Sequence, residues 1–160
     1  MTDRELILKK LEQIEQALQV LERHRTHSAK EFERSLETRW MVERGLEIIM
    51  QAVFDIGAHI LAADRKNDWE DYAGLIEKLG LHGVVPEEFA RRFRDMAGFR
   101  NVLVHEYLEI DLRILERVVK EELENFRKFV RYIMEYLERK AGGGSLESEA
   151  NMAKNESKPE

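Results

Sequence analysis

The sequence predicts an all-α fold, an antiparallel bundle of about five helices. Apolar residues recur at steps of three and four along several stretches, which is the spacing of one face of a helix. The sequence contains no run with the alternation of a strand and no long repeat. Charged residues make up 36% of the chain and proline only two positions, a composition typical of long helices with salt-bridged outer faces.

The first helix is predicted from Thr2 to about Arg23, because Thr2 and Glu5 have the spacing of a capping box. A short turn over residues 24–27 is expected to follow. The apolar stripe of this helix consists of Ile7, Leu11, Ile14, Leu18 and Leu21.

A second capping box, Ser28 with Glu31, predicts a long helix that ends near Ala63. From Leu46 onward this helix is apolar around most of its circumference, so more than one side must be covered. We therefore expect it to be the central helix and to contact a second subunit, which makes the protein a homodimer.

Three polar residues stand out in this central helix: Arg44, Asp55 and His59. Asp55 and His59 are four residues apart and face the same way. A structural or interface hydrogen-bond pair is the simpler interpretation of these two, ahead of a second functional site.

Two further helices are predicted before the last one. A short helix spans residues 71–79 and ends at Gly80, and another starts at Pro86, which suits a first helical turn. The second is expected to continue into residues 96–111, with a kink near Gly98.

The last helix is predicted to begin at a cap, Asp111, and to run to about Lys140. Residues 142–160 are polar and carry no apolar stripe, so a disordered tail is expected there. The chain thus divides into one helical domain, residues 1–141, and this tail.

Composition limits the classes of function. The absence of cysteine excludes disulfides and thiolate metal sites. The charged N-terminus and the shortness of the longest apolar stretch, residues 56–63, predict a soluble cytoplasmic protein without a membrane segment. The net charge of −6 argues against a general nucleic-acid binder, so a site for a polyanion must be local, and Arg91, Arg92 and Arg94 could supply one.

Residues 96–111 place Arg100, Asn101, His105 and Tyr107 in an otherwise apolar segment. In a regular helix Arg100 and His105 point about 140° apart, whereas Asn101 and His105 share a face, as do Arg100 and Tyr107. A two-fold axis nearby would bring two arginines and two histidines into one cleft.

Such a cleft could cleave RNA without a metal or another cofactor. The reaction needs a base for the 2′-hydroxyl, an acid for the leaving 5′-oxygen and a cation for the charge on the phosphate. Histidine and arginine meet these needs, and Asn101 could orient the imidazole or hydrogen-bond the phosphate. On spacing alone, however, an ordinary buried polar network explains these residues more simply.

The stretch Gly98-Phe-Arg-Asn-Val-Leu-Val-His-Glu-Tyr107 resembles the HEPN superfamily, and more narrowly the HepT-like toxins. Their hallmark is an arginine, usually followed by a polar residue, then His and Tyr at the spacing found here. Residues 39–48, the segment from Asp55 to His59, the residues before the motif and the start of the final helix extend the resemblance over about residues 1–140.

The resemblance implies a homodimeric, metal-independent endoribonuclease that is the toxin of a toxin–antitoxin pair. Arg100 and His105 would be the catalytic pair and Asn101 their helper. The antitoxin would be an MntA-like nucleotidyltransferase that transfers AMP to Tyr107, and the RNA substrate could be tRNA. The alternative is a non-catalytic binding subunit of a nucleotidyltransferase complex, and a purely structural dimer is a third interpretation.

Overall fold

The protein folds as a bundle of helices, and no strand occurs in the part of the chain that the structure describes. The structure is a computed structural model that describes the backbone of residues 1–104 and 109–155, and side chains within residues 1–103 and 109–142. The described helices are α1 (Asp3–Glu22), α2 (Ala29–Arg34), α3 (Leu36–Ala63), α4 (Tyr72–Leu81), α5 (Glu87–Phe93), α6 (Met96–Val104), α7 (Leu112–Glu121) and α8 (Leu123–Asn155).

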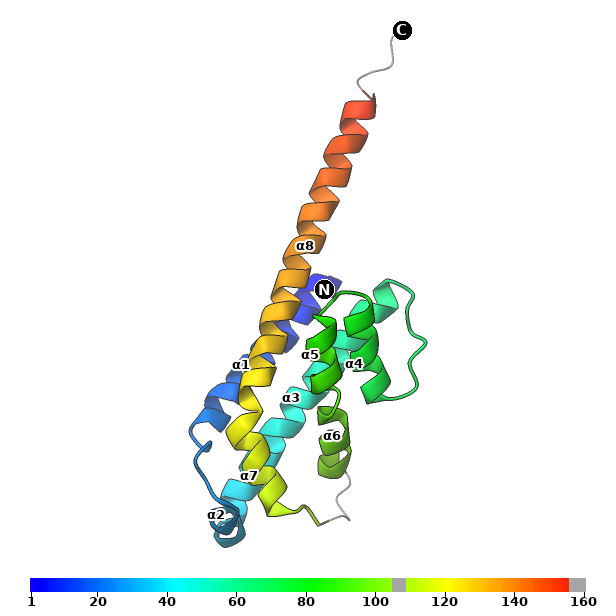
Figure 1. Cartoon of the computed structure of the whole chain (residues 1–160). Helices are drawn as coiled ribbons and strands as arrows, with labels where there is room; N and C mark the ends of the chain where they lie inside the picture. Colours follow the sequence, from blue (N-terminus) through cyan, green and yellow to red (C-terminus); the bar gives the residue numbers. More distant parts are fainter. Residues whose placement is uncertain (105–108, 156–160) are drawn as a thin grey trace.

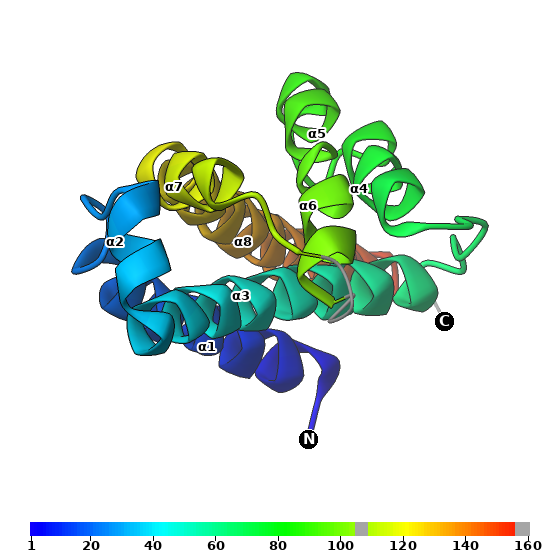
Figure 2. The same ribbon diagram turned by 90° about the horizontal axis from the view of Figure 1, so that it is seen from below.

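Helix α3 is the central element, as predicted. It runs antiparallel to α1, and α4, α5 and α6 lie on its other side (Figures 1 and 2). Its apolar circumference is buried, from Val42 through Leu61. By length and composition α3 could also cross a membrane, but more than half of the apolar stretch is buried inside the protein, as in the core helix of a soluble fold.

The buried core is entirely apolar among the described residues. Its largest fully buried side chains include Phe32 of α2 and both Phe126 and Phe129 of α8. Hydrophobic burial of these stripes is therefore what holds the helices together. Any polar residue of functional interest must lie at the edge of this core.

Three predicted long helices are interrupted, which explains why the structure has more helices than expected. Ser35 separates α2 from α3, because its hydroxyl accepts the backbone N–H of Thr38 and caps a new helix. Arg94 and Asp95 form a turn between α5 and α6, so the break comes before Gly98. Glu122 separates α7, which packs on α2, from α8, which packs on α1.

The caps predicted at Thr2 and Asp111 are confirmed, and the one at Ser28 is confirmed only in part. Thr2 and Glu5 form the complete capping box, and both Asp71 and Asp111 cap their helices as N-cap residues. Ser28 also accepts the backbone N–H of Glu31, but the Glu31 carboxylate bonds His27 and does not close the box.

The prediction that α4 ends at Gly80 is wrong, because the helix continues to Leu81 and the left-handed residue is Gly83, at φ 71°. Gly80 instead permits a close approach of α5. A Cβ atom there would lie 2.6 Å from the Cβ of Ala90 and 3.3 Å from the Cα of Glu87. This contact fixes the α4–α5 hairpin, from which α6 continues.

Helix α8 continues to Asn155, well beyond the predicted end near Lys140 (Figure 1). The last residue of its buried stripe is Leu137, so the core ends where the sequence pattern predicts. The backbone beyond it is helical even through residues 142–144, which are three glycines, although glycine is a poor helix former. Residues 156–160 lie outside the described residues.

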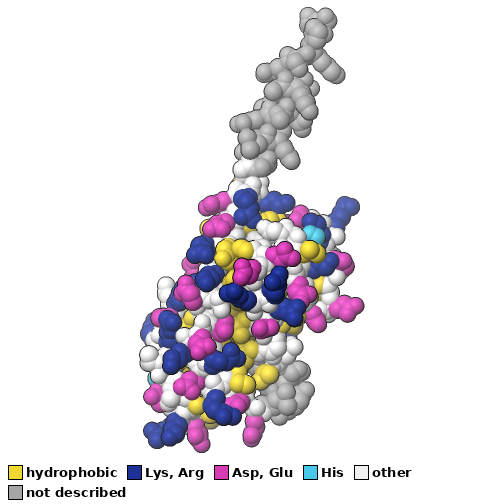
Figure 3. Space-filling view, viewed as in Figure 1, with side chains coloured by type: hydrophobic (Ala, Val, Ile, Leu, Met, Phe, Trp, Pro, Cys, Tyr) yellow, Lys and Arg dark blue, Asp and Glu magenta, His cyan; other side chains and the backbone are white. Residues whose placement is uncertain are grey.

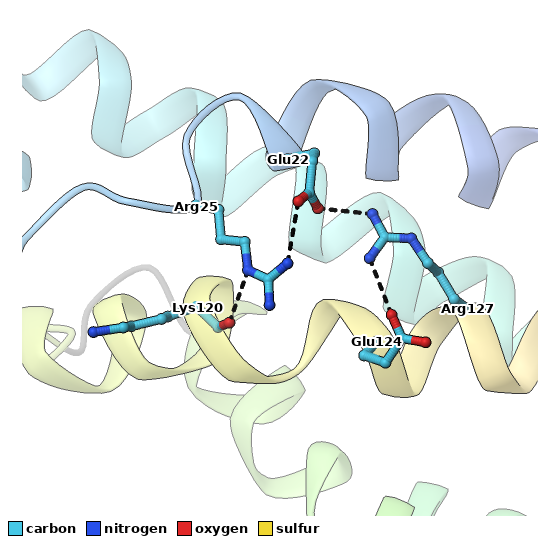
Figure 4. Close-up of polar contacts among 5 residues, drawn as sticks. All are labelled: Glu22, Arg25, Lys120, Glu124 and Arg127. Carbon is cyan, nitrogen blue, oxygen red and sulfur yellow. Dashed lines mark hydrogen bonds and ion pairs between the residues drawn. The ribbon is translucent and has the colours of Figure 1, made fainter.

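The corner where α1 meets α7 and α8 is held by ion pairs at the surface (Figure 4). The Glu22 carboxylate receives Arg25 at 3.1 Å and Arg127 at 2.7 Å, and Arg127 also reaches Glu124 at 3.4 Å. The Arg25 Nε donates to the Lys120 carbonyl oxygen at 3.1 Å. Hydrogen bonds from Arg127 and then Arg25 lower the pKa of Glu22, and the bond to Glu22 raises the pKa of Arg127.

Candidate active site

Helix α6 carries the residues that the sequence singled out. It is short, and it rests on α3 and α4 (Figure 2). Met96, Ala97 and Phe99 point into the core, each at most 7% exposed. This burial turns Arg100 to the rim of the bundle, where it is half-buried, and leaves Asn101 exposed.

The Arg100 guanidinium lies on a stack of two aromatic rings. Its Cζ atom is 3.9 Å from the centroid of the Tyr72 ring and 5.8 Å from that of Phe54. The two rings stack on each other, with centroids 4.0 Å apart and an interplanar angle of 27°. Phe54 is buried in α3 and Tyr72 opens α4, so the arginine is seated where three helices meet.

A chain of polar contacts leads from Arg100 across the bundle. Its Nη2 donates to the Gln51 side-chain oxygen at 3.4 Å, and the Gln51 amide donates to Asp55 at 2.9 Å. Asp55 in turn pairs with Lys10 of α1 at 2.9 Å. Gln51 thus separates the arginine from the carboxylate of Asp55, which already has a cationic partner.

The structure tests only part of the predicted motif. Arg100 and Asn101 lie on consecutive positions of α6, as expected. His105 and Tyr107 fall outside the described residues, so their places relative to Arg100 stay predictions. Arg100 is half-buried at the rim and the described core contains no polar side chain, while the polar-network interpretation of the whole motif stays untested because His105 and Tyr107 lie outside the described residues.

The secondary polar candidates do not form one cluster. Asp55 and His59 line the same groove between α1 and α3, but each bonds a different residue of α1: Asp55 bonds Lys10, and the His59 ring bonds Asp3 at 2.7 Å. They are therefore structural links to α1. Arg44 is exposed and pairs with Glu47 at 3.2 Å within its own helix.

The predicted basic patch on α5 is largely neutralised. Arg92 pairs with Glu88 at 2.9 Å and Arg94 with Glu77. On the face in Figure 3, basic and acidic side chains are interspersed, so that face presents no broad positive surface. Attraction for a polyanion at the described part of the site therefore depends on few charges, Arg100 among them.

No group of three or more His, Asp or Glu side chains arranged to hold a metal occurs within the described residues. The sequence reasoning missed Phe54, Tyr72 and Gln51, which surround Arg100. The sequence shows Tyr72 directly after a possible cap, Asp71, but nothing in that pattern indicates a contact with Arg100, 28 positions later.

Comparison with known proteins gives consistent matches. A model of the family described as ribonuclease HepT-like matches residues 7–133. The tRNA nuclease HepT of Aphanizomenon flos-aquae is 32% identical over 133 residues, which cover 82% of this chain and 90% of that protein. The mRNA nuclease HepT of Shewanella oneidensis is 27% identical over 85 residues, 53% of this chain and 64% of that protein.

Two solved structures share the fold. The tri-AMPylated HEPN toxin of Shewanella oneidensis, in complex with MNT antitoxin, matches with a TM-score of 0.72 at 23% identity, covering 84% of this chain and 98% of that one. The cytosolic protein YutE of Bacillus subtilis, of unknown function, matches with a TM-score of 0.75 at 22% identity, covering 88% and 94%.

Proposed function

Because the chain belongs to the ribonuclease HepT-like family, we propose that it is a metal-independent endoribonuclease and the toxin of a toxin–antitoxin pair. The observation that carries this proposal is the position of Arg100 and the neutral character of its contacts. It lies at the rim of the bundle in the family motif, seated on neutral aromatic rings, with N–H donors left for a phosphate.

The proposed chemistry is attack of the RNA 2′-hydroxyl on the adjacent phosphorus. The bond from phosphorus to the 5′-oxygen breaks, which yields a 2′,3′-cyclic phosphate and a 5′-hydroxyl. His105 moves the proton from the nucleophile or to the leaving oxygen. Arg100 stabilises the negative charge that builds on the phosphate oxygens, since guanidinium keeps its charge and binds phosphate through paired donors. Asn101 orients the imidazole.

The active cleft is proposed to form between two subunits. If the helix stays regular through His105, Arg100 and His105 point about 140° apart, and one subunit alone would present them poorly. A two-fold axis beside α6 would supply the histidine of one subunit to the arginine of the other. Light scattering at micromolar concentration should give the mass of a dimer, and a monomer that cleaves RNA would contradict the shared cleft.

Inhibition is proposed to occur by transfer of AMP from ATP to Tyr107, catalysed by an MntA-like nucleotidyltransferase antitoxin. The similar toxin of Shewanella oneidensis is AMPylated and bound to its antitoxin. Tyr107 lies seven residues after Arg100, a spacing that puts the two side chains on one side if the helix continues that far. Negatively charged AMP groups there would occupy the arginine and block the cleft.

The substrate is proposed to be cytoplasmic RNA, with tRNA as the first candidate. A tRNA nuclease matches over 82% of this chain, and an mRNA nuclease matches over 53%. A cytoplasmic location agrees with YutE, which is described as cytosolic.

The test is cleavage of total tRNA and of mRNA in EDTA by wild type, His105→Ala and His59→Ala. His59 is a matched control because it is a surface histidine that bonds Asp3, away from Arg100. Loss of acid–base catalysis should lower the rate of His105→Ala by roughly 10²–10⁴-fold, while His59→Ala stays close to wild type. Equal cleavage by wild type and His105→Ala would contradict the proposal.

A second candidate function is a non-catalytic subunit that presents Tyr107 to a nucleotidyltransferase. The net charge of −6 and the interspersed surface charges favour it. Intact-mass measurement after co-expression with the nucleotidyltransferase should show added AMP in either case. Added AMP together with no cleavage by the unmodified chain would select this second function.

A further inference from the structure

We propose that Tyr72 is a positioning residue for Arg100, with Gln51 as its partner, and that together they hold the guanidinium in the orientation that binds the scissile phosphate. The inference deepens the proposed ribonuclease function and rests on it. It assigns a role to a residue of α4 that lies 28 positions before the motif.

The geometry of the stack carries the first step. At 3.9 Å from the ring centroid, the Arg100 Cζ lies in van der Waals contact with the face of Tyr72, well within the range of a cation–π interaction. Phe54, 2% exposed, backs Tyr72 from the core. Phe54 therefore prevents the Tyr72 ring from moving toward the core, and the guanidinium packs on a ring of fixed position.

The second step concerns hydrogen-bond donors. An aromatic face attracts a cation without consuming its N–H groups, whereas a carboxylate would occupy two of them. Gln51 accepts one N–H from Nη2 at 3.4 Å. A guanidinium has five N–H donors, so the remaining ones stay available for an anion. Tyr72 and Gln51 thus fix the orientation of the guanidinium and leave most of its N–H donors available.

The third step concerns entropy. A free arginine side chain loses rotamer freedom when it is immobilised. Because the stacking on Tyr72 and the bond to Gln51 form when the protein folds, this rotamer freedom is lost at folding and not when the phosphate binds. Catalysis gains when the charge is already in place as the transition state forms.

The kinetic test compares wild type with Tyr72→Phe and Tyr72→Leu. Phenylalanine keeps the aromatic face, whereas leucine keeps apolar burial against Phe54 but cannot attract the cation. We expect kcat to fall by about 3- to 30-fold in Tyr72→Leu, the range of one cation–π interaction, with KM changed less than the rate. Tyr72→Phe should stay within about twofold of wild type.

The matched control is Tyr132→Leu. Tyr132 is another half-buried tyrosine packed against the core, and it has Arg131 over its ring at 5.2 Å, but it lies on α8 against Phe89. It should leave kcat unchanged. Thermal unfolding of each variant separates loss of the seat from loss of the fold. An equal fall of kcat in Tyr72→Leu and Tyr132→Leu would overturn the proposal.

A second readout does not depend on activity. The Nε–H resonance of Arg100, assigned with Arg100→Lys, should be shifted upfield by the ring current of Tyr72 in wild type and in Tyr72→Phe, and should lose that shift in Tyr72→Leu. An unchanged resonance, or an unchanged kcat, in Tyr72→Leu would overturn the positioning role. If the wild type cleaves no RNA, the proposed function fails, and the resonance alone decides whether Tyr72 holds Arg100.

Discussion

Arg100 and Arg127 are both held in place at the surface of the bundle, but by opposite kinds of partner. Arg127 lies between two carboxylates, Glu22 at 2.7 Å and Glu124 at 3.4 Å. Arg100 lies on an aromatic ring and reaches a neutral amide. The first cation is neutralised by its neighbours, and among the described residues the second keeps its full charge.

The different partners of the two arginines indicate a structural role for Arg127 and a functional role for Arg100. Paired with two glutamates, Arg127 ties α8 to α1 and has little left to offer an incoming anion. The Arg100 site achieves order by dispersion and quadrupole attraction, which do not cancel charge. An arginine fixed by neutral groups at the rim of a bundle is thus prepared for an external phosphate. Each variant below tests one side of this comparison.

The largest expected effect belongs to Arg100→Ala. Removing a positioned donor to the transition state should lower RNA cleavage by about 10²–10³-fold, while the thermal unfolding temperature changes little, because Arg100 has no charged partner among the described residues. The control is Arg131→Ala, which also removes an arginine from above a tyrosine ring and should cleave normally. Cleavage by Arg100→Ala at the wild-type rate would remove the distinction between the two arginines.

Gln51→Glu should make the surroundings of Arg100 resemble those of Arg127. A carboxylate beside the guanidinium would compete with phosphate for the same donors. We expect a loss of cleavage on the order of tenfold, the cost of one charge-assisted hydrogen bond. Gln13→Glu, at an exposed position of α1, adds the same charge elsewhere and should leave the rate unchanged. An equal loss of cleavage in Gln51→Glu and Gln13→Glu would contradict the idea that neutral partners keep Arg100 available to phosphate.

Arg127→Ala should show the reverse pattern. Its ion pairs are partly exposed, so the free energy of unfolding should fall by less than about 1 kcal/mol, measured by denaturant unfolding. Cleavage should be unaffected. A large loss of activity with unchanged stability would place Arg127 in the functional machinery and contradict its structural role.

The smallest effect concerns pH. Because its arginine partners lower the pKa of Glu22 in the folded state, ionised Glu22 stabilises the fold at pH above 4.5, the ordinary pKa of this carboxyl. That contribution is lost as the pH falls through the lowered folded-state pKa. The stability difference between wild type and Glu22→Gln should therefore be constant near neutrality and vanish in acid. A difference that grows in acid would contradict the assignment.

Much of the fold was predictable because its determinants are local. The caps at Thr2, Asp71 and Asp111 are recognised by a side chain within three residues, and the stripes of α1 and α8 by a period within each helix. The breaks at Ser35 and Glu122 were missed, because the stripe of each long helix continues across the break. There, bonds within one turn and packing on different partner helices override the pattern.

The candidate site was predictable only in part, for a related reason. Arg100 and Asn101 belong to one short motif, and a resemblance can locate them. Tyr72 and Gln51 reach Arg100 through the packing of α4 and α3 against α6, contacts that no spacing in the sequence encodes. Asp55 stands out in the sequence for its spacing from His59, yet its hydrogen bond from Gln51 connects it toward Arg100.

The described part of α6 spans nine residues, and this bears on how the site fluctuates. A helix so short is marginal by itself in water, so α6 stays ordered through its seat on α3 and α4. Its local unfolding should therefore cost less free energy than opening α1 or α3, and its amide protons should exchange with solvent through openings that leave the bundle folded. A molecule that engages Arg100 therefore contacts a helix whose order depends on its packing against α3 and α4.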